Sequence, residues 1–358
     1  MRLAEILPRG ANNLDLFRII AAAMVIFGHA YALVPVSGQS DPLAQWLGFD
    51  SSGSLAVKVF FLLSGLVVTN SLLEKRQPLQ FLIARFFRLW PALAVTVLLC
   101  ALVLGPLLTS LPLGEYFLHP ETGKYIYRNL VFRIRFPLPG VFQDNALSAV
   151  NGSLWTIPHE IAAYLGLLVL YLLGTFQRCW LPLAVLATLL AVPLLFPDES
   201  PEVSLLIACF AIGATLAFYK RHLIVNGWVV LALWLLFALF RHALVNFYLF
   251  YLALFASILF VASQSWMLRL RPRSDLSYGV YLWGFPVQQV MAQFFGAQGI
   301  LFNQLASLAI CLVLAFGSWH LVEKPAMARG AALGRRVPPE PIRRLREALT
   351  GRFTSRTR

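Results

Sequence analysis

The stretch LDLFRIIAAAMVIFGHAYALVP, residues 14–35, decides the fold class, because about 20 mostly apolar residues suffice for a helix to cross a bilayer. Nine further stretches share this character, at about 54–73, 89–110, 153–174, 180–196, 203–219, 224–240, 247–265, 277–295 and 300–321. The split between 224–240 and 247–265 rests on Arg241, His242 and Asn246. The sequence therefore predicts an all-α, polytopic transmembrane helix bundle of about ten spans. The residues before 14 lack the features of a cleaved signal peptide, so we expect the first stretch to remain as the first span.

The composition supports a protein embedded in lipid. Of its 358 residues, 59% are apolar and 13% are charged, and the mean hydropathy is +0.73. Soluble domains carry about 25% charged residues, so most of this surface must face lipid. The net charge of +13 does not indicate a nucleic-acid partner, because the basic residues fall between spans and in the C-terminal tail. The four cysteines show no CxxC or Cys/His spacing, so we expect neither disulfides nor a metal site.

The distribution of Lys and Arg predicts the orientation of the spans. If the N-terminus is cytoplasmic, 22 of the 29 basic residues fall on the cytoplasmic side. Cytoplasmic loops of membrane proteins are enriched in Lys and Arg, so we predict an N-in, C-in topology. We divide the chain into a transmembrane domain, residues 1–325, and a basic cytoplasmic tail, residues 326–358. We expect the tail to contact anionic membrane lipids.

Two ionisable side chains, Arg18 and His29, lie within the first predicted span. Such residues are costly in lipid and are functional-site candidates by default. Their separation is close to three helical turns, so both project from one face, about 16 Å apart along the axis. Arg18 suits an anionic donor arriving from the cytoplasm, and His29 suits a general base or an acyl relay. Two plainer interpretations stay open: Arg18 snorkels to the inner interface beside Asp15, and His29 is a hydrogen-bonded packing residue.

Two arginines, Arg85 and Arg88, lie in the motif RFFRLWP at the cytoplasmic mouth of the third predicted span. Residues at i and i+3 share a helix face. Two guanidinium groups on one face suit phosphate recognition. The alternative is ordinary anchoring by positive charge at the inner interface.

The outer end of the fourth predicted span carries the motif SLWTIPHE, which ends at Glu160. A carboxylate there would orient an imidazole or balance its charge. His159 competes with His29 for the role of base. The external segment 111–152 before this motif either lines an acceptor groove or packs over the bundle.

Three shorter motifs complete the pattern. In FFLLSG, residues 60–65, Ser64 and Gly65 favour close helix packing over a nucleophilic serine. Tyr278 and Tyr281 open the ninth span from the inside. The motif VEKP, residues 322–325, closes the tenth span on the same side.

Together these motifs resemble the acyltransferase-3 family of membrane acyltransferases, in order along nearly the whole chain. The matching pieces are Arg18 with His29, FFLLSG, Arg85 with Arg88 and Pro91, Ser153-Leu-Trp155 with Glu160, Tyr278 with Tyr281, and Glu323-Lys324-Pro325. One departure matters. Many relatives read Tyr-Leu-x-His in span nine, and Gly284 stands where that histidine would be, so we assign no catalysis to span nine.

The resemblance implies an enzyme of the bacterial cytoplasmic (inner) membrane that moves acyl groups, commonly acetyl from acetyl-CoA, to extracytoplasmic glycans. The acceptor stays open among O-antigen of lipopolysaccharide, exopolysaccharide and related lipid-linked sugars. By resemblance, His29 is the catalytic residue with Arg18 in support, and Arg85 and Arg88 meet the phosphates of coenzyme A. Glu160 is expected to steady the imidazolium. Tyr278 and Tyr281 are expected at the donor site.

Two rival hypotheses remain. One is a polytopic transporter or flippase that uses Arg18 and His29 as an intramembrane relay. The other is a membrane acyltransferase of different fold with an embedded histidine. We expect no metal, no fused esterase-like domain after the tenth span, and either direct transfer or an acyl-histidine intermediate.

Overall fold

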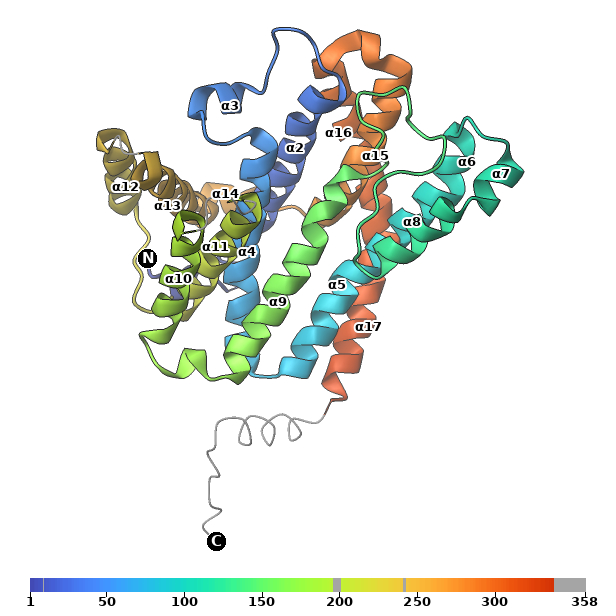
Figure 1. Ribbon diagram of the computed structural model, residues 1–358. Helices are drawn as coiled ribbons and strands as arrows, with labels where there is room; N and C mark the ends of the chain where they lie inside the picture. The colour runs from blue at the N-terminus through green and yellow to red at the C-terminus, as the bar shows by residue number, and fades with distance from the viewer. Residues whose placement is uncertain (9, 196–200, 241–242, 338–358) are drawn as a thin grey trace.

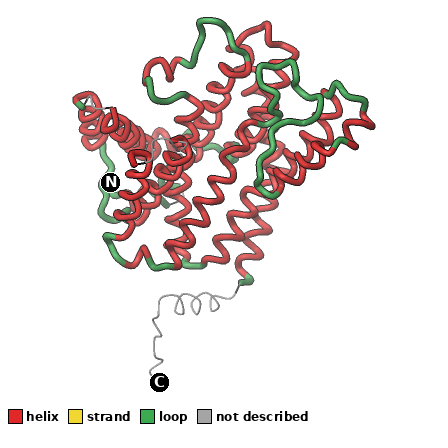
Figure 2. The backbone as a smooth tube through the Cα atoms, in the orientation of Figure 1, coloured by secondary structure: helices red, strands yellow, loops and turns green. Residues whose placement is uncertain are grey.

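The computed structural model describes residues 1–8, 10–195, 201–240 and 243–337. Within these residues the regular structure is helical, and the one β-type pairing is a single bridge between Arg2 and Ile224 (Figure 2). The predicted all-α fold class is confirmed.

The α-helices are α1 (Leu3–Ile6), α2 (Leu14–Leu33), α3 (Pro42–Leu47), α4 (Ser52–Lys75), α5 (Pro78–Leu99), α6 (Gly105–Leu108), α7 (Leu113–Leu118), α8 (Pro120–Leu130), α9 (Thr156–Leu172), α10 (Leu181–Leu195), α11 (Pro201–Phe218), α12 (Gly227–Leu239), α13 (Ala243–Ala262), α14 (Ser265–Arg269), α15 (Ser277–Phe295), α16 (Gly299–Ser318) and α17 (Lys324–Arg335). Two π-helical turns, Cys100–Leu104 and Trp319–Glu323, continue α5 and α16. Short 3-10 turns are Gly152–Trp155, Thr175–Gln177 and Gly296–Gln298.

The long helices α2, α4, α5, α9, α15 and α16 run roughly alongside one another (Figure 1). Helices α10 to α13 cover one flank, and α6 to α8 project on the opposite flank. Helix α2 packs against α4 and α15, while α16 packs against α15, and α17 packs against α5. Helix α15 is buried along most of its length.

Six helices or helical runs in the described residues are long and apolar enough to cross a membrane. They are Leu14–Leu33, Ser52–Lys75, Pro78–Leu108, Gly152–Leu172, Val245–Ala262 and Ser277–Arg335. The last run contains both α15 and α16, and shorter apolar helices lie at Leu181–Ala191, Glu202–Phe218 and Gly227–Leu239. Each predicted span overlaps one of these helices. Their length and composition describe a multi-pass membrane protein.

Two helices extend beyond their predicted limits. Helix α5 begins at Pro78 rather than near residue 89, because proline needs no N–H partner in the first turn and apolar residues follow it. Arg85 and Arg88 therefore lie on one helix, as predicted, but within it rather than at its mouth. Helix α16 continues through its π-helical turn into α17, whose first turn accommodates Pro325. The predicted division after residue 325 consequently falls inside α17, and the tail from residue 338 onwards lies outside the described residues.

Two glycines, Gly65 and Gly213, lie where α4 packs closely against α11. A Cβ atom added to Gly65 on α4 would lie 2.1 Å from the carbonyl oxygen of Phe210 on α11. A Cβ atom added to Gly213 on α11 would lie 2.2 Å from the carbonyl oxygen of Leu62 on α4. The two backbones therefore approach too closely for any side chain, which confirms the packing interpretation of Ser64-Gly65.

The N-terminal segment, at the left in Figure 1, is joined to a connection that is distant in the sequence. Leu3 donates its N–H to the carbonyl of Leu223 at 2.9 Å, which fixes the N-terminal segment to the α11–α12 connection. Arg241 and His242, on which the predicted split between two spans partly rests, lie outside the described residues. Asn246, the third residue of that prediction, donates to the carbonyls of Phe237 and Phe240 at the end of α12.

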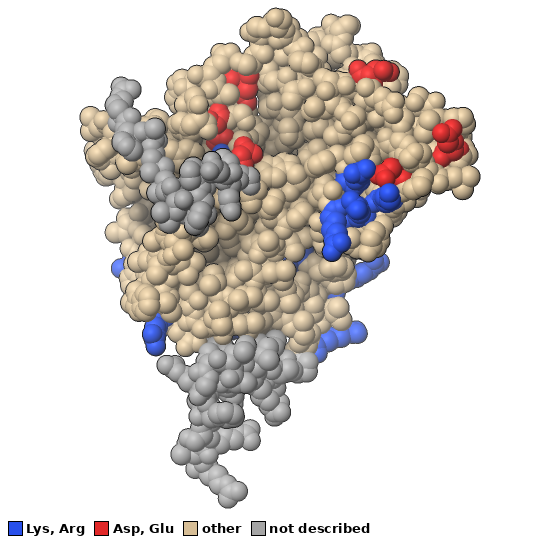
Figure 3. Space-filling view, viewed as in Figure 1, with Lys and Arg blue, Asp and Glu red and all other residues tan. Residues whose placement is uncertain are grey.

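Charged side chains are unevenly placed on the visible face. In Figure 3 the acidic groups lie in the upper half, and basic groups lie along the lower edge and on the right flank. Tan surface without charge fills most of the area between them, as expected for a surface that contacts lipid.

Candidate active site

Arg18 and His29 both lie on α2 and both contact the segment that contains α15. Arg18 Nη1 donates to Oδ2 of Asp275, just before α15, at 3.3 Å. The ring of His29 meets the ring of Phe285 on α15 edge to face, with centroids 5.2 Å apart. The predicted shared face of α2 is therefore present. Arg18 takes Asp275 rather than Asp15 as its partner.

Arg88 joins this cluster through two carboxylates. Its Nη2 lies 2.6 Å from Oδ2 of Asp275, and its Nη1 lies 3.1 Å from Oε2 of Glu323. The Arg88 side chain is 9% exposed, and that of Glu323 is fully buried. The cluster thus holds two arginines and two carboxylates, which balances its charge in a region where an unpaired charge is costly.

Asp275 is the central residue of this cluster, and the sequence interpretation missed it. Burial by itself raises the pKa of Asp275, but Arg88 and Arg18, with hydrogen bonds from Ser277, outweigh burial and hold that pKa below its ordinary value. Ser277 Oγ donates to Asp275 Oδ1 at 2.6 Å. The available signal was a lone acid in RPRSDLS, directly before the Tyr278 motif.

The two predicted donor-site tyrosines are buried, and their hydroxyls have protein partners. Tyr278 donates to the carbonyl of Leu89 at 3.0 Å, and its ring lies 5.6 Å from the Arg88 guanidinium carbon. Tyr281 donates to the carbonyl of Ser153 at 2.6 Å and lies 2.5 Å from the hydroxyl of Thr156. These contacts tie α15 to α5 and to the start of α9.

Arg85 lies beside a second polar group. Its guanidinium carbon is 5.9 Å from the ring centroid of Tyr164, and its Nε is buried without a hydrogen-bond partner among the described residues. Tyr164 donates to the Glu160 carboxylate, and its hydroxyl lies 2.8 Å from Ser64 Oγ. Glu160, Tyr164 and Ser64 therefore form a hydrogen-bonded chain beside a cation with an unused donor.

The surroundings of His29 are tightly packed. Its Nδ1 is buried and has no hydrogen-bond partner in the described part of the chain. A Cβ atom on Gly152 would lie 2.4 Å from the ring of Phe285, which contacts His29. A Cβ atom on Gly284 would lie 3.1 Å from Cγ1 of Ile26, so the missing side chain lets α15 approach α2.

Some predicted groupings do not form in this structure. Glu160 bonds Tyr164, and it does not reach Nδ1 of His29. His159 lies against Trp155, with ring centroids 5.8 Å apart. Within residues 1–8, 10–195, 201–240 and 243–337, no group of three or more His, Cys, Asp and Glu side chains is arranged to hold a metal ion.

Comparison with known proteins adds the family. The family described as "Acyltransferase domain" matches residues 11–322. The chain is 30% identical to the "O-acetyl transferase" of Shigella phage Sf6, over 90% of this chain and 97% of that protein. It is 27% identical to "Nodulation protein 10" of Rhizobium leguminosarum bv. viciae, over 91% of this chain and 96% of that protein.

No solved structure matches the chain. The family match extends from just before α2 to the π-helical turn after α16, so it includes Arg18, His29, Arg85, Arg88, Glu160 and Asp275. The chain therefore belongs to the acyltransferase-3 family and is an O-acyltransferase.

Proposed function

We propose that the protein moves an acetyl group from cytoplasmic acetyl-CoA to a hydroxyl of an extracytoplasmic carbohydrate, within the bacterial cytoplasmic membrane. The observation that carries this proposal is the pair on one face of α2: Arg18, which is 31% exposed, and His29, whose buried Nδ1 has no described partner. The name of the phage relative supports acetyl as the acyl group. The proposal keeps about ten spans and N-in, C-in termini, on the basis of the Lys and Arg distribution.

The donor end of the proposed site lies around Asp275. Arg18 is partly exposed, and Arg85 has an unused Nε donor, so these two groups fit the phosphates of an acyl-CoA. Arg88 is already paired with Asp275 and Glu323. We propose that Arg88 also binds these phosphates, which would replace Asp275 as its partner. Asp275 is the nearer and the more exposed of the two carboxylates that Arg88 contacts. Tyr278 and Tyr281 would hold α15 in position.

The chemical step uses the neutral imidazole of His29. In direct transfer, His29 accepts the proton of the acceptor hydroxyl while the oxygen attacks the carbonyl carbon of the thioester. A C–O bond forms, the C–S bond breaks, and the coenzyme A thiolate takes the proton back from the imidazolium. In the two-step route, a His29 nitrogen first attacks the thioester carbonyl and displaces the coenzyme A thiolate, which takes the imidazole N–H proton. The acceptor hydroxyl then takes the acetyl group from the imidazole, and its proton returns to the released ring nitrogen. Trapping of an acetylated His29 peptide after rapid quenching separates these routes.

Glu160 has an indirect place in this proposal. Its carboxylate accepts from Tyr164, and Tyr164 lies below the guanidinium of Arg85. We assign Glu160 to the positioning of Tyr164 and Arg85 near the donor. A direct contact with the His29 imidazolium would require a rearrangement during the reaction.

Mass analysis of surface glycans, with and without the gene, tests the function. Deletion is expected to remove one acetyl mass from one glycan, and the wild-type gene is expected to restore it. The His29→Gln gene should not restore it, although its product should reach the membrane in equal amount. An unchanged glycan profile on deletion, in cells shown to express the protein, would contradict transfer to a surface carbohydrate.

A further inference from the structure

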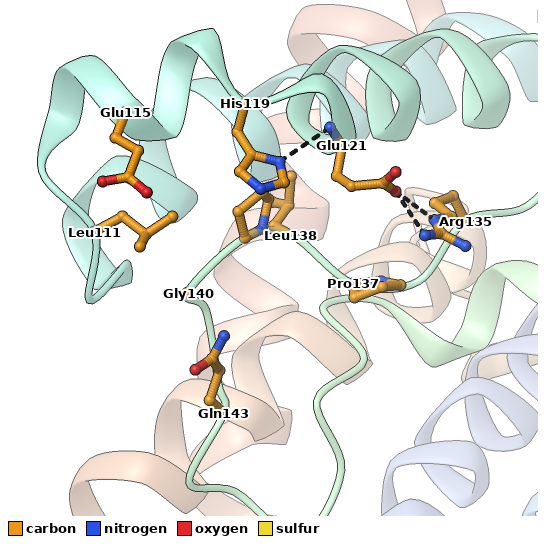
Figure 4. A pocket seen from close by; sticks show the side chains of 10 residues that line it. Leu111, Glu115, His119, Glu121, Arg135, Pro137, Leu138, Gly140 and Gln143 are labelled. Carbon is orange, nitrogen blue, oxygen red and sulfur yellow. Dashed lines mark hydrogen bonds and ion pairs between the residues drawn. The ribbon is translucent and has the colours of Figure 1, made fainter.

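A cavity of about 360 Å³ is lined by residues between α6 and α9, on the flank formed by α7 and α8 (Figure 4). We propose that it binds a neutral, hydroxyl-rich unit of the acceptor glycan. This inference rests on the proposed function, because that function places a carbohydrate outside the membrane. The polar side chains that line the cavity are Glu115, His119, Glu121, Arg135 and Gln143.

Three of these side chains have hydrogen-bonding capacity to spare. Glu115 and Gln143 make no hydrogen bond or ion pair with any residue in the described ranges. His119 accepts the N–H of Glu121 at Nδ1, at 3.2 Å, so its Nε2 carries the proton and is a donor. In Figure 4, Glu115 and His119 lie at one end of the cavity lining, and Gln143 lies at the other end, beyond Gly140. A carboxylate, an amide and an N–H together match the mixed donor and acceptor character of sugar hydroxyls.

The charges at the cavity favour a neutral ligand over an acidic one. Arg135 donates to Oε2 of Glu121 through Nε at 3.0 Å and through Nη2 at 2.6 Å. Hydrogen bonds from Lys124 and then Arg135 lower the pKa of Glu121, so this group stays ionised and paired. The remaining carboxylate, Glu115, has no cation beside it in the described residues. A uronic acid or another anionic unit would therefore meet repulsion rather than a free guanidinium.

The walls of the cavity are held in place without a ligand. Asn129 donates to the carbonyl of Arg135 at 2.9 Å and accepts the Arg135 N–H at 3.0 Å. Thr109 Oγ1 donates to the carbonyl of Pro139 at 2.8 Å. Gly140 has φ +69°, and a Cβ atom there would lie 2.5 Å from Thr109 Oγ1. A preformed wall lowers the ordering cost of binding a sugar.

The same segment leads directly to the surroundings of His29. Two residues after Gln143, Asn145 donates to the side-chain oxygen of Gln289 on α15 at 2.8 Å. Further along, Gly152 packs against Phe285, the ring that contacts His29. The segment that supplies Gln143 to the cavity therefore also supplies Gly152, which packs against the ring beside the proposed catalytic imidazole.

Binding by purified full-length protein in detergent tests this assignment independently of catalysis. The probes are immobilised neutral and uronic-acid-containing oligosaccharides, prepared from the surface polysaccharide of a strain that lacks the gene and from common plant and yeast polysaccharides. The double variant Glu115→Ala/Gln143→Ala is expected to lose at least about tenfold in affinity for the neutral probes that the wild type binds. Leu118→Ala, an 86% exposed position on the same helix α7, is the matched control and should bind like the wild type.

His29→Gln separates the failure of this inference from the failure of the proposed function. It should bind neutral probes like the wild type but transfer no acetyl group. If the wild-type protein bound neutral sugars through Glu115 and Gln143 but showed no acetyl transfer, the proposed function would be wrong and the sugar site would stand. Absence of neutral-sugar binding by the wild type, a preference for acidic probes, or equal binding by the double variant would overturn the sugar site.

Discussion

Oδ2 of Asp275 lies 2.6 Å from Nη2 of Arg88, which joins the segment before α15 to the middle of α5. The same oxygen lies 3.3 Å from Nη1 of Arg18 on α2. One carboxylate therefore links three helices that belong to separate parts of the sequence. The donor end of the proposed site depends on this link.

Asp275→Asn is expected to destabilise the protein, because it removes the shared partner of two arginines. Loss of one partner of a buried ion pair costs about 3–5 kcal/mol, and Asp275 is 17% exposed, so we expect the lower part of that range. The midpoint of thermal unfolding in detergent measures the effect. Asp144→Asn is the control, because Asp144 is exposed and makes no ion pair in the described residues. Equal midpoints for the two variants would remove Asp275 from the structural core.

The contribution of Asp275 to the stability of the fold is expected to fall in acid and to stay constant at neutral pH. Its pKa is held below the ordinary value, so its stabilising effect is complete above the ordinary carboxyl pKa and is lost as the pH falls through the lowered value. The difference in unfolding midpoint between wild type and Asp275→Asn should thus be constant from about pH 5 to about pH 8, and should shrink only in stronger acid. A difference that shrinks steadily across neutral pH would contradict this assignment.

Arg85→Ala is expected to weaken donor binding without unfolding the protein. The lost hydrogen bond to a charged phosphate is worth about 1.5–3 kcal/mol, which predicts a rise of about tenfold or more in KM for acetyl-CoA. Arg85→Lys should give a smaller rise, because it keeps the charge and loses the planar fork. Initial rates at varied acetyl-CoA concentration provide the measurement. An unchanged KM in Arg85→Ala would place the phosphates elsewhere.

Lys58 has a structural role that is separate from the donor site. Its Nζ lies 2.8 Å from Oδ2 of Asp50, both side chains are almost fully buried, and Tyr251 also donates to Asp50. Lys58→Ala leaves Asp50 without its cation, so we expect a loss of about 3–5 kcal/mol in stability. Lys124→Ala is the matched control at an exposed pair, with an expected loss below about 1 kcal/mol. Similar unfolding midpoints for both variants would show that the Asp50 pair is not structural.

The sequence predicted the helical class and the approximate positions of the long apolar helices, because runs of apolar residues are a local signal. The common face of Arg18 and His29 was also predictable, since helical periodicity alone determines it. The start of α5 was placed too late. The helix extends through QFLIARFFR, residues 80–88, where Gln80 and the two arginines lower the local hydropathy without interrupting the helix.

The partners of the charged residues were not predictable from spacing. Asp275 and Glu323 are far from Arg88 in the sequence, and only the packing of α5, α15 and the turn after α16 brings them together. Phe285 was missed for the same reason, because an aromatic residue within an apolar helix carries no signal of its neighbour. The cavity beside α7 depends on backbone turns at Gly140 and Phe142, which both have positive φ angles.

Transfer of radiolabelled acetyl from acetyl-CoA by inside-out membrane vesicles, with the acceptor glycan enclosed, tests the central claim most directly. His29→Gln is expected to lower the rate of glycan labelling at least about 100-fold at equal protein level, because the step loses its general base or acyl carrier. His222→Gln, at an exposed histidine on the α11–α12 connection, should keep the wild-type rate. Labelling by His29→Gln at the wild-type rate would contradict catalysis by the imidazole on α2.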